Sequence, residues 1–178
     1  MLTLFSVVRV EAAGSVVKGS GPAVYYVGTN GKRYVFPTSS VYFSWYPDFS
    51  KMKMAEDKKL NAYPISGHVL MRPGSRLLKS VTDPKVYAVE PGGILRWVAT
   101  EAIAKSLYGS SWAKRVDDLP DTFFASYRQG VPLSAGEYPN GWLAIDASVT
   151  PPSPVLLWDG QKRALTDKQL TELRIDRA

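Results

Sequence analysis

The sequence predicts an α+β fold made of repeated β-hairpin plus short-helix units, with mostly antiparallel sheet. Three observations lead to this prediction. A phrase of strand, turn and strand occurs at residues 24–35, 86–98 and 155–165. A glycine-containing turn lies inside each copy, as short β-hairpins require. A threonine follows each copy, at positions 38, 100 and 166, where a helix can begin. Such self-similarity indicates one supersecondary unit copied along the chain.

The first copy predicts a hairpin followed by a helix. Residues 23–27 and 33–36 are rich in tyrosine and valine, and they flank Asn30 and Gly31, a dipeptide that tolerates positive φ. Thr38 then opens a helical segment that ends before Pro47.

The second and third copies predict the same order of elements. In the second copy, Thr100 caps a helix over residues 101–108 that stops at Gly109. In the third copy, Thr166 and Gln169 have the spacing of a capping box, in which each side chain bonds the backbone N–H of the other residue. We therefore expect each helix to start next to its threonine.

A second recurring block lies between the copies. Its first occurrence is a Pro-Gly turn flanked by residues 68–71 and 76–79, which we interpret as another hairpin. Its second occurrence is the similar stretch of residues 132–145. Short helices are predicted upstream of the two blocks, over residues 56–63 and 120–128.

The repeat divides the chain into four segments. Residues 1–13 are interpreted as a truncated secretory signal peptide, 14–80 as repeat unit 1 and 81–148 as repeat unit 2. Residues 149–178 form a partial repeat unit 3, which begins with a connector whose prolines exclude both helix and central strand.

The signal-peptide interpretation rests on the first residues of the chain. A short apolar run at residues 2–8 is followed by small residues in the pattern that a signal peptidase cleaves, before Ala13. The alternative is a buried first strand. No stretch is long enough to predict a transmembrane segment.

Composition narrows the classes of function. The 178 residues include no cysteine, which excludes disulfides, thiolate nucleophiles and cysteine-based zinc sites. The net charge of +6 favours anionic partners. The basic residues are dispersed, however, so we do not expect nucleic acid as a partner.

No sequence motif predicts catalysis. His68 is the one histidine of the chain, and no nucleophile motif accompanies it. Asp117, Asp118 and Asp121 form a carboxylate cluster, which we interpret first as helix capping, with Asp118 as the cap of the helix at 120–128. A calcium site is one alternative for the cluster, and the acids of a glycoside hydrolase are another. No other cofactor is expected.

An arginine recurs beside an aromatic or apolar residue in each copy. If the aromatic side chain faces the core, the arginine faces solvent, because neighbouring strand residues point to opposite faces. The functional interpretation is a periodic anchor for an anionic glycan or a neighbouring subunit, and the structural alternative is an ion pair or cation–π contact inside each unit. The candidate ligand-binding residues are Arg33, Tyr34, Arg96, Trp97 and Arg163.

A family resemblance lies in three parts of the chain: residues 24–26 with 31–37, residues 42–46 and residues 83–98. In these phrases the chain resembles the repeat-containing secreted, S-layer-like surface proteins of uncultivated small-genome bacteria, over about residues 15–133. The resemblance implies a surface protein, and it supplies no catalytic residues.

The sequence therefore predicts a non-enzymatic, exported cell-envelope protein, located outside the cell or at its surface. It is expected to act by adhesion or by binding a surface-layer or cell-wall polymer, with self-association as another mode. The alternative function is a secreted carbohydrate-active hydrolase or accessory domain that uses the aspartate cluster.

Overall fold

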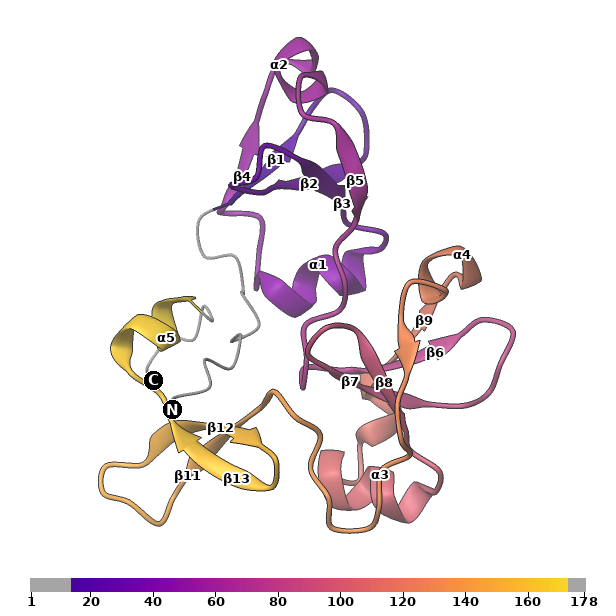
Figure 1. Ribbon diagram of the computed structural model, residues 1–178, viewed down its shortest axis with the longest axis vertical. Coiled ribbons are helices and arrows are strands. Elements are labelled where there is room, and N and C mark those ends of the chain that lie inside the picture. The colour runs from indigo at the N-terminus through magenta and orange to yellow at the C-terminus, as the bar shows by residue number, and fades with distance from the viewer. Residues whose placement is uncertain (1–13, 173–178) are drawn as a thin grey trace, which may run out of the picture. The chain divides into compact units, whose positions relative to one another are not determined.

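The computed structural model describes residues 14–172 (Figure 1). The predicted signal peptide, residues 1–13, lies outside the described residues. The chain divides into two compact units. Of the described residues, the first unit contains 14–36, 48–69 and 166–172, and the second contains 37–47 and 70–165.

The first unit contains a five-stranded mixed sheet in the order β4-β1-β2-β3-β5. β1 (Ser15–Lys18), β2 (Val24–Val27) and β3 (Arg33–Val35) form an antiparallel meander. The two outer strands return later in the chain: β4 (Met52–Met54) pairs in parallel with β1, and β5 (Ile65–His68) pairs in parallel with β3.

The second unit contains a five-stranded sheet in the order β9-β6-β7-β8-β10. β6 (Leu77–Ser80), β7 (Tyr87–Glu90) and β8 (Ile94–Trp97) form its antiparallel meander. β9 (Val116–Leu119) pairs in parallel with β6, and β10 (Arg128–Gln129) pairs in parallel with β8. Strand order and pairing directions are therefore the same as in the first sheet.

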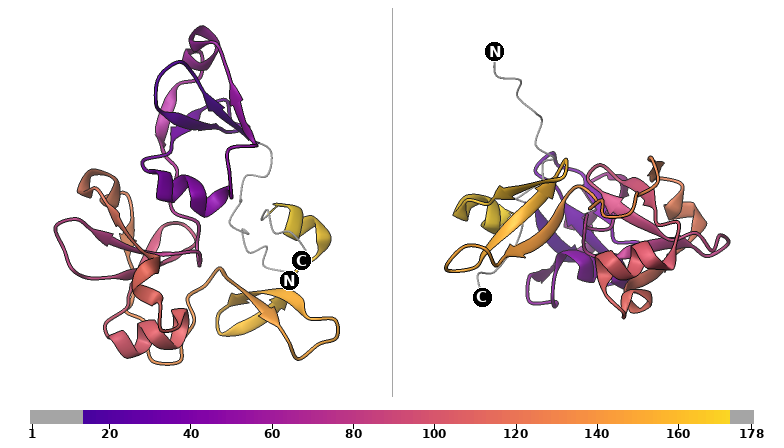
Figure 2. Two further views of the ribbon diagram at one scale, coloured as in Figure 1. Left: turned by 180° about the vertical axis from the view of Figure 1, so that it is seen from behind. Right: turned by 90° about the horizontal axis from the view of Figure 1, so that it is seen from below.

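A third, three-stranded sheet also belongs to the second unit and is seen from behind in Figure 2. β11 (Trp142–Asp146), β12 (Ser153–Trp158) and β13 (Gln161–Ala164) form an antiparallel meander. Its order matches that of the three central strands in the other two sheets.

A helix follows each meander, and its threonine caps it as predicted. The hydroxyl oxygens of Thr38, Thr100 and Thr166 each accept the backbone N–H three residues ahead, at 3.2 Å. Gln169 returns the bond by accepting the N–H of Thr166 at 2.9 Å, which completes the predicted capping box. The helices are α1 (Ser39–Trp45), α2 (Asp57–Asn61), α3 (Glu101–Tyr108), α4 (Asp121–Phe124) and α5 (Asp167–Glu172), with a 3-10 helix, η1, at Trp112–Arg115.

The α+β class is confirmed, and the two five-stranded sheets prove to be mixed. The predicted hairpin of residues 68–71 with 76–79 is wrong, because β5 and β6 belong to different sheets. The Pro-Gly turn lies in the connection between β5 and β6, where Gly74 donates its N–H to the carbonyl of Val89 in β7. The similar prediction for residues 132–145 fails too, since β11 pairs with β12, which follows it in the chain.

The helix predicted over residues 120–128 is a single turn, α4. Pro120 stands at its N-cap, and no side chain bonds there. Asp118, the predicted cap, lies in β9 and forms an ion pair with Lys79 at 2.7 Å. Parallel pairing of β9 with β6 brings these two residues side by side.

The core of the second unit lies between the second sheet and α3. Leu77 and Ala88 from the sheet pack with Ala104 and Tyr108 from α3, and Trp142 covers this cluster from the start of β11. Tyr108 and Trp142 place their ring centroids 4.6 Å apart. The third sheet is therefore joined to α3 through an aromatic contact.

Two buried tyrosines of this unit differ in their hydrogen bonding. The Tyr127 hydroxyl accepts the backbone N–H of Met71 at 2.7 Å. The Tyr108 hydroxyl has no hydrogen-bond partner among the described residues, and its burial raises its pKa above the usual value.

We predict opposite effects of removing these two hydroxyls. Tyr127→Phe should lower the free energy of unfolding by about 1–2 kcal/mol, because the buried Met71 N–H loses its acceptor. Tyr108→Phe should leave stability unchanged or raise it by about 1 kcal/mol, since a buried hydroxyl without a partner costs free energy. Urea unfolding of the two variants measures this, and equal losses in both would contradict the assignment.

Candidate functional site

Hydrogen bonds at the end of each hairpin align the first two sheets residue by residue. The N–H of Phe36 donates to the carbonyl of Val24 at 2.9 Å. The N–H of Val98 donates to the carbonyl of Val86 at the same distance. Phe36 therefore corresponds to Val98, and Val24 corresponds to Val86.

This alignment separates the recurring arginines. Tyr26 pairs with Tyr34 in the first sheet, where Ala88 pairs with Arg96 in the second. Arg96 thus stands in the position of Tyr34, one residue further along its strand than Arg33. Arg33 and Arg96 therefore do not occupy equivalent positions in these two sheets.

Arg96 lies at the centre of a buried ion-pair network. Its Nη1 is 2.8 Å from Glu90 Oε1, and its Nη2 is 2.5 Å from Glu137 Oε1. The side chains of Arg96 and Glu90 are only 12% and 6% exposed. Glu90 Oε1 also accepts the N–H of Asn140 at 3.0 Å, which joins the hairpin to the loop before β11. The Ser134 N–H, together with Arg96, holds the pKa of Glu137 below its usual value.

The other predicted residues of the arginine series make local contacts. Arg33 donates to Asn61 Oδ1 at 3.0 Å, and its guanidinium lies 4.8 Å from the Tyr25 ring centroid. The Tyr34 hydroxyl accepts a hydrogen bond from the Asn30 side chain at 2.8 Å. These bonds lie within the first unit.

Arg163 is the most exposed arginine of the series. It lies in β13, with its guanidinium 5.7 Å from the Trp158 ring centroid and Nη2 3.9 Å from Asp159 Oδ2. Its side chain is 51% exposed. Arg163 therefore forms a surface cation–π pair within the third sheet.

The three clustered aspartates do not share one site. Asp117 forms an ion pair with Arg76, Asp118 forms one with Lys79, and Asp121 accepts hydrogen bonds from Ser80 and Thr82. Those bonds hold the pKa of Asp121 below its usual value, Ser80 having the largest effect. Within residues 14–172, no group of three or more His, Cys, Asp or Glu side chains is placed to hold a metal ion. Calcium binding and catalysis by these residues stay predictions.

His68, the one histidine, lies half-buried in β5 of the first sheet. The three clustered aspartates lie in the second unit. The structure therefore places His68 and the three clustered aspartates in different units.

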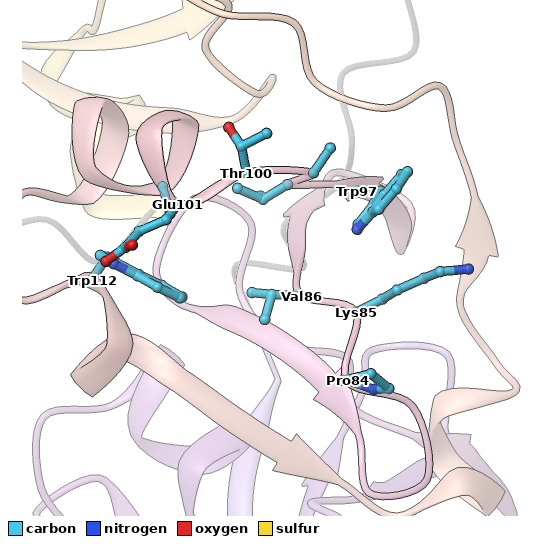
Figure 3. A pocket seen from close by; sticks show the side chains of 10 residues that line it. Pro84, Lys85, Val86, Trp97, Thr100, Glu101 and Trp112 are labelled. Carbon is cyan, nitrogen blue, oxygen red and sulfur yellow. The ribbon is translucent and has the colours of Figure 1, made fainter.

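A pocket of about 250 Å³ lies where α3 begins, in the second unit (Figure 3). It is formed by the strand ends around Val86 and Trp97, by the first turn of α3 and by η1. We call it the Trp97 pocket. Its lining residues are Pro84, Lys85, Val86, Trp97, Val98, Ala99, Thr100, Glu101, Ala104 and Trp112.

A charged side chain lies next to each of the two indole rings of the Trp97 pocket (Figure 3). Lys85 Nζ lies 5.5 Å from the Trp97 ring centroid, a cation–π contact. At the other end, Glu101 lies beside Trp112, as Figure 3 shows. Lys105 forms an ion pair with Glu101 at 3.0 Å. This pair holds the pKa of Glu101 below its usual value, and a hydrogen bond from Trp112 makes a smaller contribution. The pocket thus combines apolar ring faces with charged and hydroxyl groups.

Only one of the lining residues was among the predicted site residues. Trp97 was predicted, whereas Lys85, Thr100, Glu101 and Trp112 were not. One sequence feature could have pointed to Lys85, because this residue directly precedes the second copy of the repeated phrase, which also contains Trp97. Trp112 comes from a 3-10 helix after α3 and has no counterpart in the phrase.

The alignment of the sheets also shows that the pair of Lys85 and Trp97 is particular to the second sheet. The first sheet has Ala23 in the position of Lys85, and it has Val35 in the position of Trp97. The pairs Tyr25–Val35 and Tyr87–Trp97 end the two hairpins in the same register. A small apolar residue is therefore compatible with the backbone at both positions.

Comparisons with protein-family models, with curated proteins and with solved structures found no match to this chain. No helix among residues 14–172 combines the length and apolar character that crossing a membrane requires. A functional conclusion therefore rests on the chemistry of the site itself.

We predict that Arg96 stabilises the fold. Arg96→Met should lower the free energy of unfolding by about 3 kcal/mol, because Glu90 would stay buried without its counter-charge. Chemical denaturation measures the loss.

An exposed ion pair supplies the matched control. Lys59 and Glu56 are 3.0 Å apart with side chains 71% and 70% exposed. Lys59→Ala should therefore cost less than about 1 kcal/mol. A loss in Arg96→Met no larger than in this control would show that the buried network contributes little.

Proposed function

We propose that the protein is a non-enzymatic, exported component of the cell envelope that binds a surface or cell-wall glycan in the Trp97 pocket. The observation that carries the proposal is the pairing of two indoles with charged and hydroxyl groups around one cavity. Of the modes expected from the sequence, this chemistry favours polymer binding over self-association.

Sugar rings suit such a lining. A pyranose ring has an apolar face of C–H groups, which gains free energy when it covers an aromatic ring. Its hydroxyl groups require hydrogen-bond partners. Trp97 and Trp112 offer ring faces, and the Thr100 hydroxyl and Glu101 carboxylate offer acceptors.

The carboxylates around the pocket support binding without hydrolysis. Glycoside hydrolases in general use two carboxyl groups that flank the scissile bond. Glu101 is the one acidic residue among those that line the Trp97 pocket, and it is paired with Lys105.

We also infer that the first and second sheets are two copies of one repeat and that the third sheet begins another. Supporting observations are the same strand order and pairing directions in the two larger sheets, and the threonine-capped helix after each meander. Repeats of this kind suit an extended surface protein. Export rests on the sequence of residues 2–12, the signal-like apolar run and the small residues after it.

The proposal predicts that Trp97 is required for binding polysaccharide. Retardation of the wild-type protein in native gels that contain soluble cell-wall or plant polysaccharides measures the affinity. Trp97→Val should weaken binding by about fivefold, because an aromatic contact of about 1 kcal/mol is lost. Valine is the residue that the first sheet has in this position.

Trp158→Val is the matched control. Trp158 is also half-buried in a strand with a cation over its ring, but it is not among the residues that line the pocket. Its replacement should leave retardation unchanged. The proposal fails if wild-type protein binds no polysaccharide, or if both variants lose the same affinity.

A further inference from the structure

We infer that the sugar bound in the Trp97 pocket is acidic, with a carboxylate on its ring as in uronic acids. This inference rests on the proposed function and goes further by naming the class of glycan.

The positive charge of Lys85 is available to a ligand. Its side chain is exposed and extends along the Trp97 side of the pocket (Figure 3). Among residues 14–172, no carboxylate forms an ion pair with the Lys85 Nζ. The nearby Asp83 accepts the backbone N–H of Lys85, at 2.9 Å. Within residues 14–172, the ammonium group of Lys85 therefore has its cation–π contact with Trp97 and no ion pair.

The negative charge of the pocket, in contrast, is compensated. Glu101 pairs with Lys105 at 3.0 Å, one helical turn away. Glu101 therefore adds a hydrogen-bond acceptor to its end of the pocket without leaving a net negative charge there. The uncompensated charge at the cavity is that of Lys85, and the net charge of +6 attracts anions to the whole protein.

Lys85 and Trp97 together favour a sugar ring that carries an anionic group. A ring that covers the Trp97 indole brings its substituents near the ammonium group, which is 5.5 Å from the ring centroid. A carboxylate on that ring would form a charge-assisted hydrogen bond with Lys85. A neutral sugar lacks the anion, and a polyol phosphate lacks the ring. A uronate supplies both.

A panel of polymers tests the inference. Isothermal titration of the wild-type protein compares an oligogalacturonate with a neutral glucan oligosaccharide and with poly(glycerol phosphate). We expect the uronate to bind best and its affinity to fall with added salt. Lys85→Ala should weaken uronate binding by about fivefold and leave glucan binding unchanged. Alanine is the residue at this position in the first sheet.

Arg163→Ala is the matched control, because it removes another exposed cation that lies over a tryptophan ring. It should not alter uronate binding. Equal binding of uronate and glucan by the wild-type protein would overturn the inference and leave glycan binding intact. Poly(glycerol phosphate) binding as tight as uronate binding would also overturn it, since no ring would then be required. Binding of none of the three would overturn the proposed function itself.

Discussion

The fold depends on strands that return to the edges of a short meander. The central strands of the first two sheets have three or four residues each, and hairpins of that size are marginal in water. A parallel partner at each edge completes both sheets, and a parallel partner requires a crossover. In the second sheet the first crossover runs through α3 and η1 to β9. That crossover carries Thr100, Glu101 and Trp112 to the ends of the hairpin strands, so the pairing pattern itself creates the Trp97 pocket.

The cations of the second unit fall into two chemical classes. Arg96 is buried between two carboxylates, where its charge is fully used in holding the hairpin to the loop before β11. Lys85 is exposed beside an indole and has its charge available. The distinction is one of burial and pairing: Arg96 stabilises the fold, and the role we propose for Lys85 is ligand recognition. Arginines that recur in the sequence therefore have different surroundings in the fold.

Local chemistry was predictable from the sequence, and long-range pairing was not. The Asn30–Gly31 turn and the three threonine caps were predicted because each depends on residues only a few positions apart. β4, β5, β9 and β10 have two to four residues and no alternating pattern, so their partners could not be read from the chain. Asp118 was misassigned for the same reason, since Lys79 lies far from it in sequence. Trp97 was predicted as a site residue, but its companions in the pocket converge only in three dimensions.

The most direct test of the central claim is the response of the indole N–H signals to sugar. The chain has five tryptophans, and each gives one indole signal in a ¹H–¹⁵N spectrum. Titration with oligogalacturonate should shift the signals of Trp97 and Trp112, which line the pocket. The signals of Trp45, Trp142 and Trp158 should stay in place. Shifts confined to those three, or no shift at saturating sugar, would contradict the assignment of the Trp97 pocket as the binding site.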